Sequence, residues 1–87
     1  MRRILKFQLG LIAAARVAAA SPGDVVHVGE QFGGLCAWVL VDESQPAQAS
    51  LVVRGTGDYA YAGEEHVGTA QMSDGLVWHV FWRAGAC

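Results

Sequence analysis

The chain has 87 residues, of which 53% are hydrophobic and 16% are charged, and its formal net charge at pH 7 is −2. A chain this apolar can bury a core, and its length favours a single domain over residues 1–87. The near balance of six basic and eight acidic residues excludes both the basic surface of a nucleic-acid-binding protein and the dense acidic surface of a nucleic-acid mimic.

The chain begins with three basic residues, an apolar stretch and a run of small residues, in the order that a secretory leader follows. Arg16 interrupts the apolar stretch, and residues 3–9 alternate between apolar and polar side chains, which is typical of a half-buried strand. The apolar stretch is also shorter than the roughly 20 residues that span a bilayer. We therefore expect a strand that is retained in the fold, a cytoplasmic protein and no membrane partner.

Residues 11–20 are rich in alanine and precede Pro22 and Gly23. Alanine has the highest helix propensity, and the apolar residues of this segment recur at helical spacing. A helix this short is marginal without packing, however, so an extended arm is equally compatible with the pattern. The sequence leaves the two alternatives open.

Five further segments are candidate strands, with branched and aromatic residues dominant in the last segment and a more polar composition in residues 65–72. They are residues 24–31, 35–42, 50–55, 65–72 and 76–83. Gly33 and Gly34 separate the first pair, and Asp74 and Gly75 separate the last pair, which predicts two hairpins because glycine tolerates the positive φ of a tight turn. The chain is therefore expected to be mainly all-β, as a single small antiparallel sheet, a sandwich or a partly open barrel of about six strands.

The segments 35–42 and 76–83 are apolar on both faces. Such strands are covered on both sides, so we expect them either to lie centrally in a sheet or to place one face against another chain. The second alternative predicts a homodimer.

Catalytic and metal-binding patterns are missing from the sequence. Cys36, three histidines and several carboxylates are present, but no local spacing groups them as a nucleophile with its base or as a set of metal ligands. We expect His79 to be a core or interface histidine, and Cys36 and Cys87 to be thiols in a reducing compartment. The sequence thus predicts a protein that is not an enzyme and has no catalytic residues, metal or cofactor.

Several short motifs occur together along the chain. They are Cys36-x-Trp38-x-x-Val41-Asp42, Gly55-Thr56-Gly57 and His79-Val80-Phe81, after an opening Lys-Phe-Gln-Leu. In order and spacing the chain resembles a family of small bacteriophage and prophage proteins that carry a domain of unknown function. The resemblance includes the N-terminal residues, which implies that they belong to the domain, and it implies a small protein made inside a bacterium. It implies no activity.

Binding functions remain. The first hypothesis is a phage accessory protein that binds a host protein, such as a defence or regulatory component, with Trp82 as an anchor. In the alternative, Trp38 and Trp78 fill the core and Trp82 covers an edge or a homodimer contact. The second hypothesis is a binder that sequesters a nucleotide-like ligand through Arg54, Thr56, Tyr59 and Tyr61, which offer a guanidinium, a hydroxyl and stacking faces. The third is a minor structural or assembly role in a virion.

Overall fold

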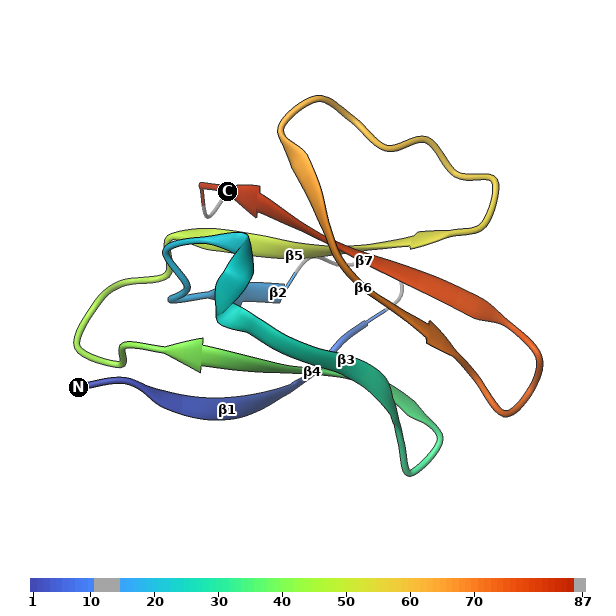
Figure 1. Cartoon of the computed structure of the whole chain (residues 1–87), viewed down its shortest axis with the longest axis horizontal. Helices are drawn as coiled ribbons and strands as arrows, with labels where there is room; N and C mark the ends of the chain where they lie inside the picture. The colour runs from blue at the N-terminus through green and yellow to red at the C-terminus, as the bar shows by residue number, and fades with distance from the viewer. Residues whose placement is uncertain (11–14, 86–87) are drawn as a thin grey trace.

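The computed structural model describes residues 1–10 and 15–85, and Figure 1 shows that strands dominate this part of the chain. One short 3₁₀ helix, η1, spans Pro22–Asp24. The strands are β1 (Arg3–Gln8), β2 (Ala15–Val17), β3 (Val25–Gln31), β4 (Gly34–Val41), β5 (Ala49–Gly55), β6 (Glu64–Gln71) and β7 (Val77–Ala84). The six strands predicted from the sequence are all present, each within one residue of its predicted ends.

The strands form two antiparallel sheets that are not closed into a barrel. The first sheet has the order β1-β4-β3, and the second has the order β2-β5-β7-β6. Both predicted hairpins are confirmed, because β3 pairs with β4 and β6 pairs with β7. Among the three predicted arrangements, two sheets around one core correspond to the sandwich.

One strand, β2, was not among the six predicted strands, and it decides between helix and extended arm for part of residues 11–20. Ala15 pairs with Leu51 and Val17 pairs with Ala49, so this part of the segment is extended and the helix alternative is wrong for it. Pairing with β5 buries Val17 completely while Arg16 points to solvent, an alternation that a strand provides. Residues 11–14 of the predicted arm lie outside the described residues.

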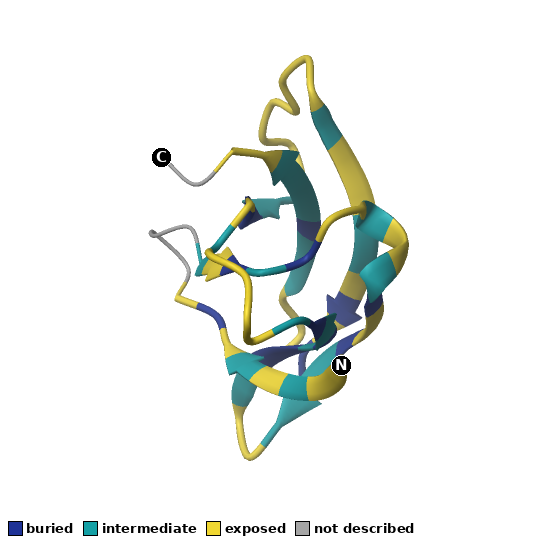
Figure 2. Cartoon of the chain, turned by 90° about the vertical axis from the view of Figure 1, so that its left-hand side faces the viewer, coloured by how far each residue is buried: buried dark blue, intermediate teal, exposed yellow. Residues whose placement is uncertain are grey.

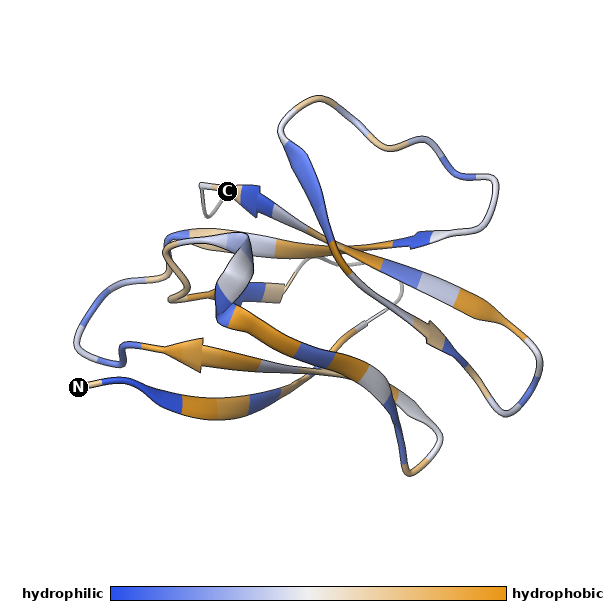
Figure 3. Ribbon diagram, in the orientation of Figure 1, coloured by the Kyte–Doolittle hydropathy of each residue, from blue (hydrophilic) through white to orange (hydrophobic). Residues whose placement is uncertain are grey.

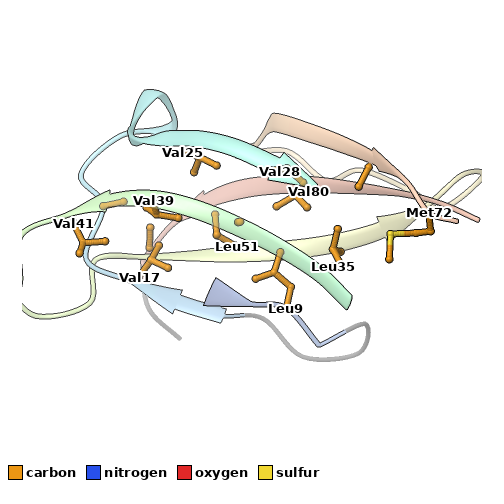
Figure 4. Close-up of a cluster of buried hydrophobic side chains, with 14 residues drawn as sticks. Leu9, Val17, Val25, Val28, Leu35, Val39, Val41, Leu51, Met72 and Val80 are labelled. Atoms are coloured by element: carbon orange, nitrogen blue, oxygen red, sulfur yellow. The ribbon is translucent and has the colours of Figure 1, made fainter. Parts of the chain in front are cut away.

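The core lies between the two sheets, as Figure 4 shows. From β4, Leu35, Val39 and Val41 point inward, and Leu51 of β5 and Val80 of β7 meet them from the opposite sheet. β4 and β7 each lie between two other strands of their sheet, whereas β1 lies at an edge and shows alternating bands in Figure 3. The first of the two alternatives for these strands is therefore confirmed.

The outward face of β4 carries the residues that alternate with the core positions. Trp38 lies on this face, half-buried, with its ring centroid 5.2 Å from that of His27. The prediction that Trp38 fills the core is thus wrong, because its parity is opposite to that of Val39. Cys36 shares the outward face but is buried as a free thiol, as predicted for a structural cysteine, and Cys87 lies outside the described residues.

The two sheets approach each other most closely where β3 meets β6. Each strand has a bulge, between Val25 and His27 in β3 and between His66 and Gly68 in β6. The extra residue in β3 lets Val25 and Val28 both reach the core although they are three residues apart. A Cβ atom on Gly68 would lie 2.5 Å from Cγ2 of Val28, so only glycine allows this approach.

Candidate functional site

The loop between β5 and β6, residues 56–63, is exposed along its whole length and is the uppermost loop in Figure 2. It carries three of the predicted site residues, Thr56, Tyr59 and Tyr61. Its first turn is closed locally. The Asp58 carboxylate accepts a 2.7 Å hydrogen bond from the Gly55 N–H, and the Asp58 N–H donates to the Gly55 carbonyl at 3.0 Å. Gly57 has a φ of 96°, which the turn requires and which glycine adopts without strain.

An ion pair closes the other end of the loop. Nη2 of Arg54 donates to Oε2 of Glu64 at 2.6 Å, and the guanidinium lies 5.0 Å from the ring centroid of Tyr61. The Tyr61 N–H also donates to Oε1 of Glu64 at 3.3 Å. The Glu64 side chain is only 1% exposed, so this carboxylate holds both strand and loop in place.

The same contacts shift the pKa values of both partners. The hydrogen bond from Arg54 lowers the pKa of Glu64, although burial opposes the shift, and the bond to Glu64 raises the pKa of Arg54. Arg83 adds a second cation, with Nη1 3.9 Å from Oε2 of Glu64. The guanidinium of Arg54 is therefore engaged by a carboxylate of its own chain, which it shares with Arg83.

A row of side chains, which we call the polar strip, crosses the outer face of the second sheet. Oγ1 of Thr56 lies 2.9 Å from Nε2 of His79, and Oγ1 of Thr69 lies 3.0 Å from Nδ1 of His79. Thr69 also lies 2.8 Å from Nε2 of His66. The bulge in β6 makes this possible, because His66 and Thr69 would otherwise point to opposite faces.

The side chains of the polar strip form a hydrogen-bonded row and do not have the composition of a catalytic triad. Thr56 and His79 have the spacing of a nucleophile and its base, but the third position, which a carboxylate fills in a triad, is filled by the neutral hydroxyl of Thr69. Both imidazole nitrogens of His79 are thus engaged by threonine hydroxyls. His79 lies partly buried on the outer face of the sheet. Of the two predicted alternatives, a core histidine or an interface histidine, the first is therefore wrong.

A pocket of about 380 Å³ opens beside the loop, at the end of β5 and the start of β7. Its lining combines backbone with two large apolar side chains. The lining residues are Gly55, Thr56, Gly75, Leu76, Val77 and Trp78. Two carboxylates are attached to its walls, because Asp58 accepts from the Gly55 N–H and Asp74 accepts from the Leu76 N–H at 3.0 Å.

The structure brings together some of the predicted site residues and separates others. Arg54 and Tyr61 are in contact, Thr56 begins the same loop, and Tyr59 is 81% exposed on it. Trp82 is on the opposite face of the sheet, where it pairs with Leu51 and packs against the core. Its indole N–H is buried with no hydrogen-bond partner in the described part of the chain.

Sequence reasoning missed three members of the site, Glu64, His66 and Thr69. The register of β6 against β7 and the bulge within it decide that these side chains share a face with Arg54 and His79. Glu64 carried a usable signal, since an acidic residue at a strand start can pair with a basic residue on the neighbouring strand, and Glu64 lies opposite Arg83 of β7.

Within residues 1–10 and 15–85, no three histidine, cysteine or acidic side chains are grouped so that they could hold a metal ion. No helix in these ranges has the length and apolar character needed to cross a membrane.

The fold and the loop define a small open β-sandwich with a preorganised surface loop. The chain belongs to a family defined by a domain of unknown function, DUF7352, which matches residues 1–86. No curated protein and no solved structure matches the chain. The family match includes β1, in agreement with the expectation that the N-terminal strand is part of the domain.

Proposed function

We propose that this chain is a non-enzymatic binding protein whose β5–β6 loop, residues 56–63, contacts a protein partner. One observation carries the proposal: Tyr59 and Tyr61 are 81% and 60% exposed on a loop that is fixed at both ends. Tyrosine supplies a large contact area at a low cost in conformational entropy and is enriched at interfaces. A loop already held in its binding conformation also loses less entropy when a partner binds.

Arg54 favours this proposal over the nucleotide-binding alternative. A phosphate-binding arginine needs a guanidinium that is available to the ligand, whereas Arg54 already makes two bonds to Glu64. A nucleotide would have to displace a buried carboxylate from its partner, which costs much of the binding energy gained. No feature of the loop favours a structural role in a virion.

The resemblance to small phage and prophage proteins supports a more specific form of the proposal. In this form the chain is a phage accessory protein in the bacterial cytoplasm, and its partner is a host protein with a defence or regulatory role. The exposed tyrosines would provide the anchors of that interface, in place of Trp82, which packs against the core.

Crosslinking capture from bacterial cells tests the proposal. The double variant Tyr59→Ala/Tyr61→Ala is expected to lose at least about tenfold of the captured partner, because hot-spot tyrosines contribute about 1–2 kcal/mol or more each. Ile4→Ala is the matched control, since Ile4 is 56% exposed on β1 and away from the loop. Equal capture by the double variant and the wild type would refute the role of the loop.

A further inference from the structure

Phe32 is the most conspicuous exposed side chain of the fold apart from the first residue of the chain. It is 95% exposed at the tip of the β3–β4 hairpin, and its φ of 52° lies in the left-handed region that phenylalanine rarely adopts. Exposure and backbone conformation are both unfavourable for this residue in an isolated chain. A residue that violates two local preferences at one position points to a function outside the fold of the single chain.

The pocket beside Leu76 and Trp78 has the size and lining to hold a phenyl ring. Its volume is about 380 Å³, and a cavity of about 150 Å³ is enough for benzene in another protein. Leu76 is 52% exposed, so its apolar surface is available. The Trp78 indole offers an edge or face to a second aromatic ring, a contact that adds to simple burial.

The surroundings of Phe32 and of the pocket are complementary in charge. Nζ of Lys6 lies 5.9 Å from the centroid of the Phe32 ring and 2.6 Å from the neutral side chain of Gln31. Within the described residues Lys6 forms no ion pair. Asp58 and Asp74 are attached to the walls of the pocket through backbone hydrogen bonds. The positive charge of Lys6 beside the Phe32 ring is therefore complementary to the negative charges of Asp58 and Asp74 beside the pocket.

Phe32 and the pocket also lie at the same end of the molecule. The Glu30 carboxylate accepts hydrogen bonds from Ser73, at 3.1 Å from its N–H and 2.9 Å from its hydroxyl, which ties the β3–β4 turn to the β6–β7 turn. Figure 1 shows both turns at the end of the fold away from the N-terminus. A two-fold axis at this end would let two copies exchange the same contact, which closes the assembly as a dimer.

From these observations we infer that the chain forms a two-fold homodimer in which Phe32 of each copy enters the pocket of the other. Lys6 then approaches Asp58 and Asp74 across the interface. The inference goes beyond the proposed function of the β5–β6 loop and does not depend on it. It rests on Phe32 and the pocket, and not on the two apolar faces of residues 35–42 and 76–83 from which the sequence predicts a homodimer.

Sedimentation equilibrium tests the inference on the full chain. The wild type should associate to a dimer, and Phe32→Ala should raise the dimer dissociation constant roughly a hundredfold or more, because two phenyl rings are lost from the interface. Ile4→Ala, an exposed apolar residue of β1, should leave the constant unchanged. A wild type that stays monomeric at its highest soluble concentration, or a Phe32→Ala dimer as tight as the wild type, would overturn the inference.

The charge component has a separate test. Lys6→Gln should weaken the dimer severalfold and reduce its sensitivity to salt, whereas Arg16→Gln, a change of the same charge on β2, should do neither. A Lys6→Gln dimer with wild-type affinity and salt dependence would contradict the pairing with the two aspartates. If the chain is monomeric and Phe32→Ala instead abolishes capture of a bacterial protein, Phe32 belongs to an interface with a different partner and the homodimer is wrong.

Discussion

The turns of the two hairpins, β3–β4 and β6–β7, both contain a residue with positive φ, but they use different residue types there. In the β6–β7 turn, Gly75 has the positive φ of 91°, and the Asp74 carboxylate accepts the Leu76 N–H. In the β3–β4 turn, Phe32 and Gly33 connect the strands, and Phe32 has a positive φ although it carries a bulky side chain. The first turn meets the preferences of a tight turn, and the second departs from them.

The difference between the turns indicates what each is for. Residues that satisfy their local requirements contribute to folding, so the Asp74-Gly75 turn is accounted for within one chain. Phe32 sits where asparagine would fit better, and its ring is almost fully exposed, with Nζ of Lys6 5.9 Å from the ring centroid. We infer that the β3–β4 turn is less stable than a turn with asparagine at position 32 would be, and that Phe32 is retained there as an exposed aromatic anchor.

Gly68→Ala tests the contact that joins the two hairpins, and we expect it to have the largest effect on stability. The added methyl group would meet Val28 at 2.5 Å, so the hairpins must move apart or distort, at a cost of about 1–3 kcal/mol. Chemical denaturation measures the loss. Gly10→Ala is the control, because nothing lies within 4 Å of the position of its Cβ. A Gly68→Ala chain as stable as the wild type would contradict the close approach of β3 and β6.

The acidic residue that begins the β6–β7 hairpin provides a second test. Glu64→Gln leaves Arg54 without its carboxylate and should lower the free energy of unfolding by about 1–2 kcal/mol, less than a fully buried pair because Arg54 is 24% exposed. Because the folded pKa of Glu64 lies below the ordinary value of 4.5, its contribution is present above that pH and is lost as the pH falls through the folded pKa.

The dependence of the free energy of unfolding on pH provides the control for the Glu64→Gln variant. The stability of the wild type should fall faster below pH 4.5 than that of Glu64→Gln, and the two curves should converge in acid. Parallel curves over the whole range would show that the ion pair with Arg54 does not stabilise the fold.

Phe32→Asn makes the first turn resemble the second and should have the smallest effect on stability. Asparagine tolerates a positive φ, so the variant is expected to gain about 1 kcal/mol in the stability of the monomer. Thermal denaturation at concentrations where the chain is monomeric measures the gain. An unchanged or lower stability would mean that the Phe32 ring contributes to the fold of the single chain, contrary to the comparison of the turns.

Much of this fold follows from local patterns in the sequence. The alternation in residues 3–9 and the Asp74-Gly75 turn are properties of adjacent residues, so the strands and hairpins they predict are found in the structure. Strand β2 was missed because three residues, Ala15–Val17, are too few to show a period and because alanine favours helices. Its conformation is decided by pairing with β5, which is distant in sequence.

The candidate site was predicted less completely, because it depends on register. Arg54 and Tyr61 were identified by residue type, but their common partner Glu64 depends on how β5 and β6 are placed on β7. Trp82 was predicted to be an anchor for a protein partner, because the face of β7 that meets the core could not be known from a strand that is apolar on both sides. The bulge that aligns His66 with Thr69 is a non-local feature of the same kind.

An isotope-filtered NOE experiment on a mixture of labelled and unlabelled chains tests directly whether Phe32 is an intermolecular anchor. We expect intermolecular cross-peaks between the ring protons of Phe32 in one copy and the Trp78 indole and Leu76 methyl groups in the other. Absence of these cross-peaks in a dimeric sample, or intermolecular cross-peaks confined to another surface such as the outer face of β1 and β4, would contradict this role of Phe32.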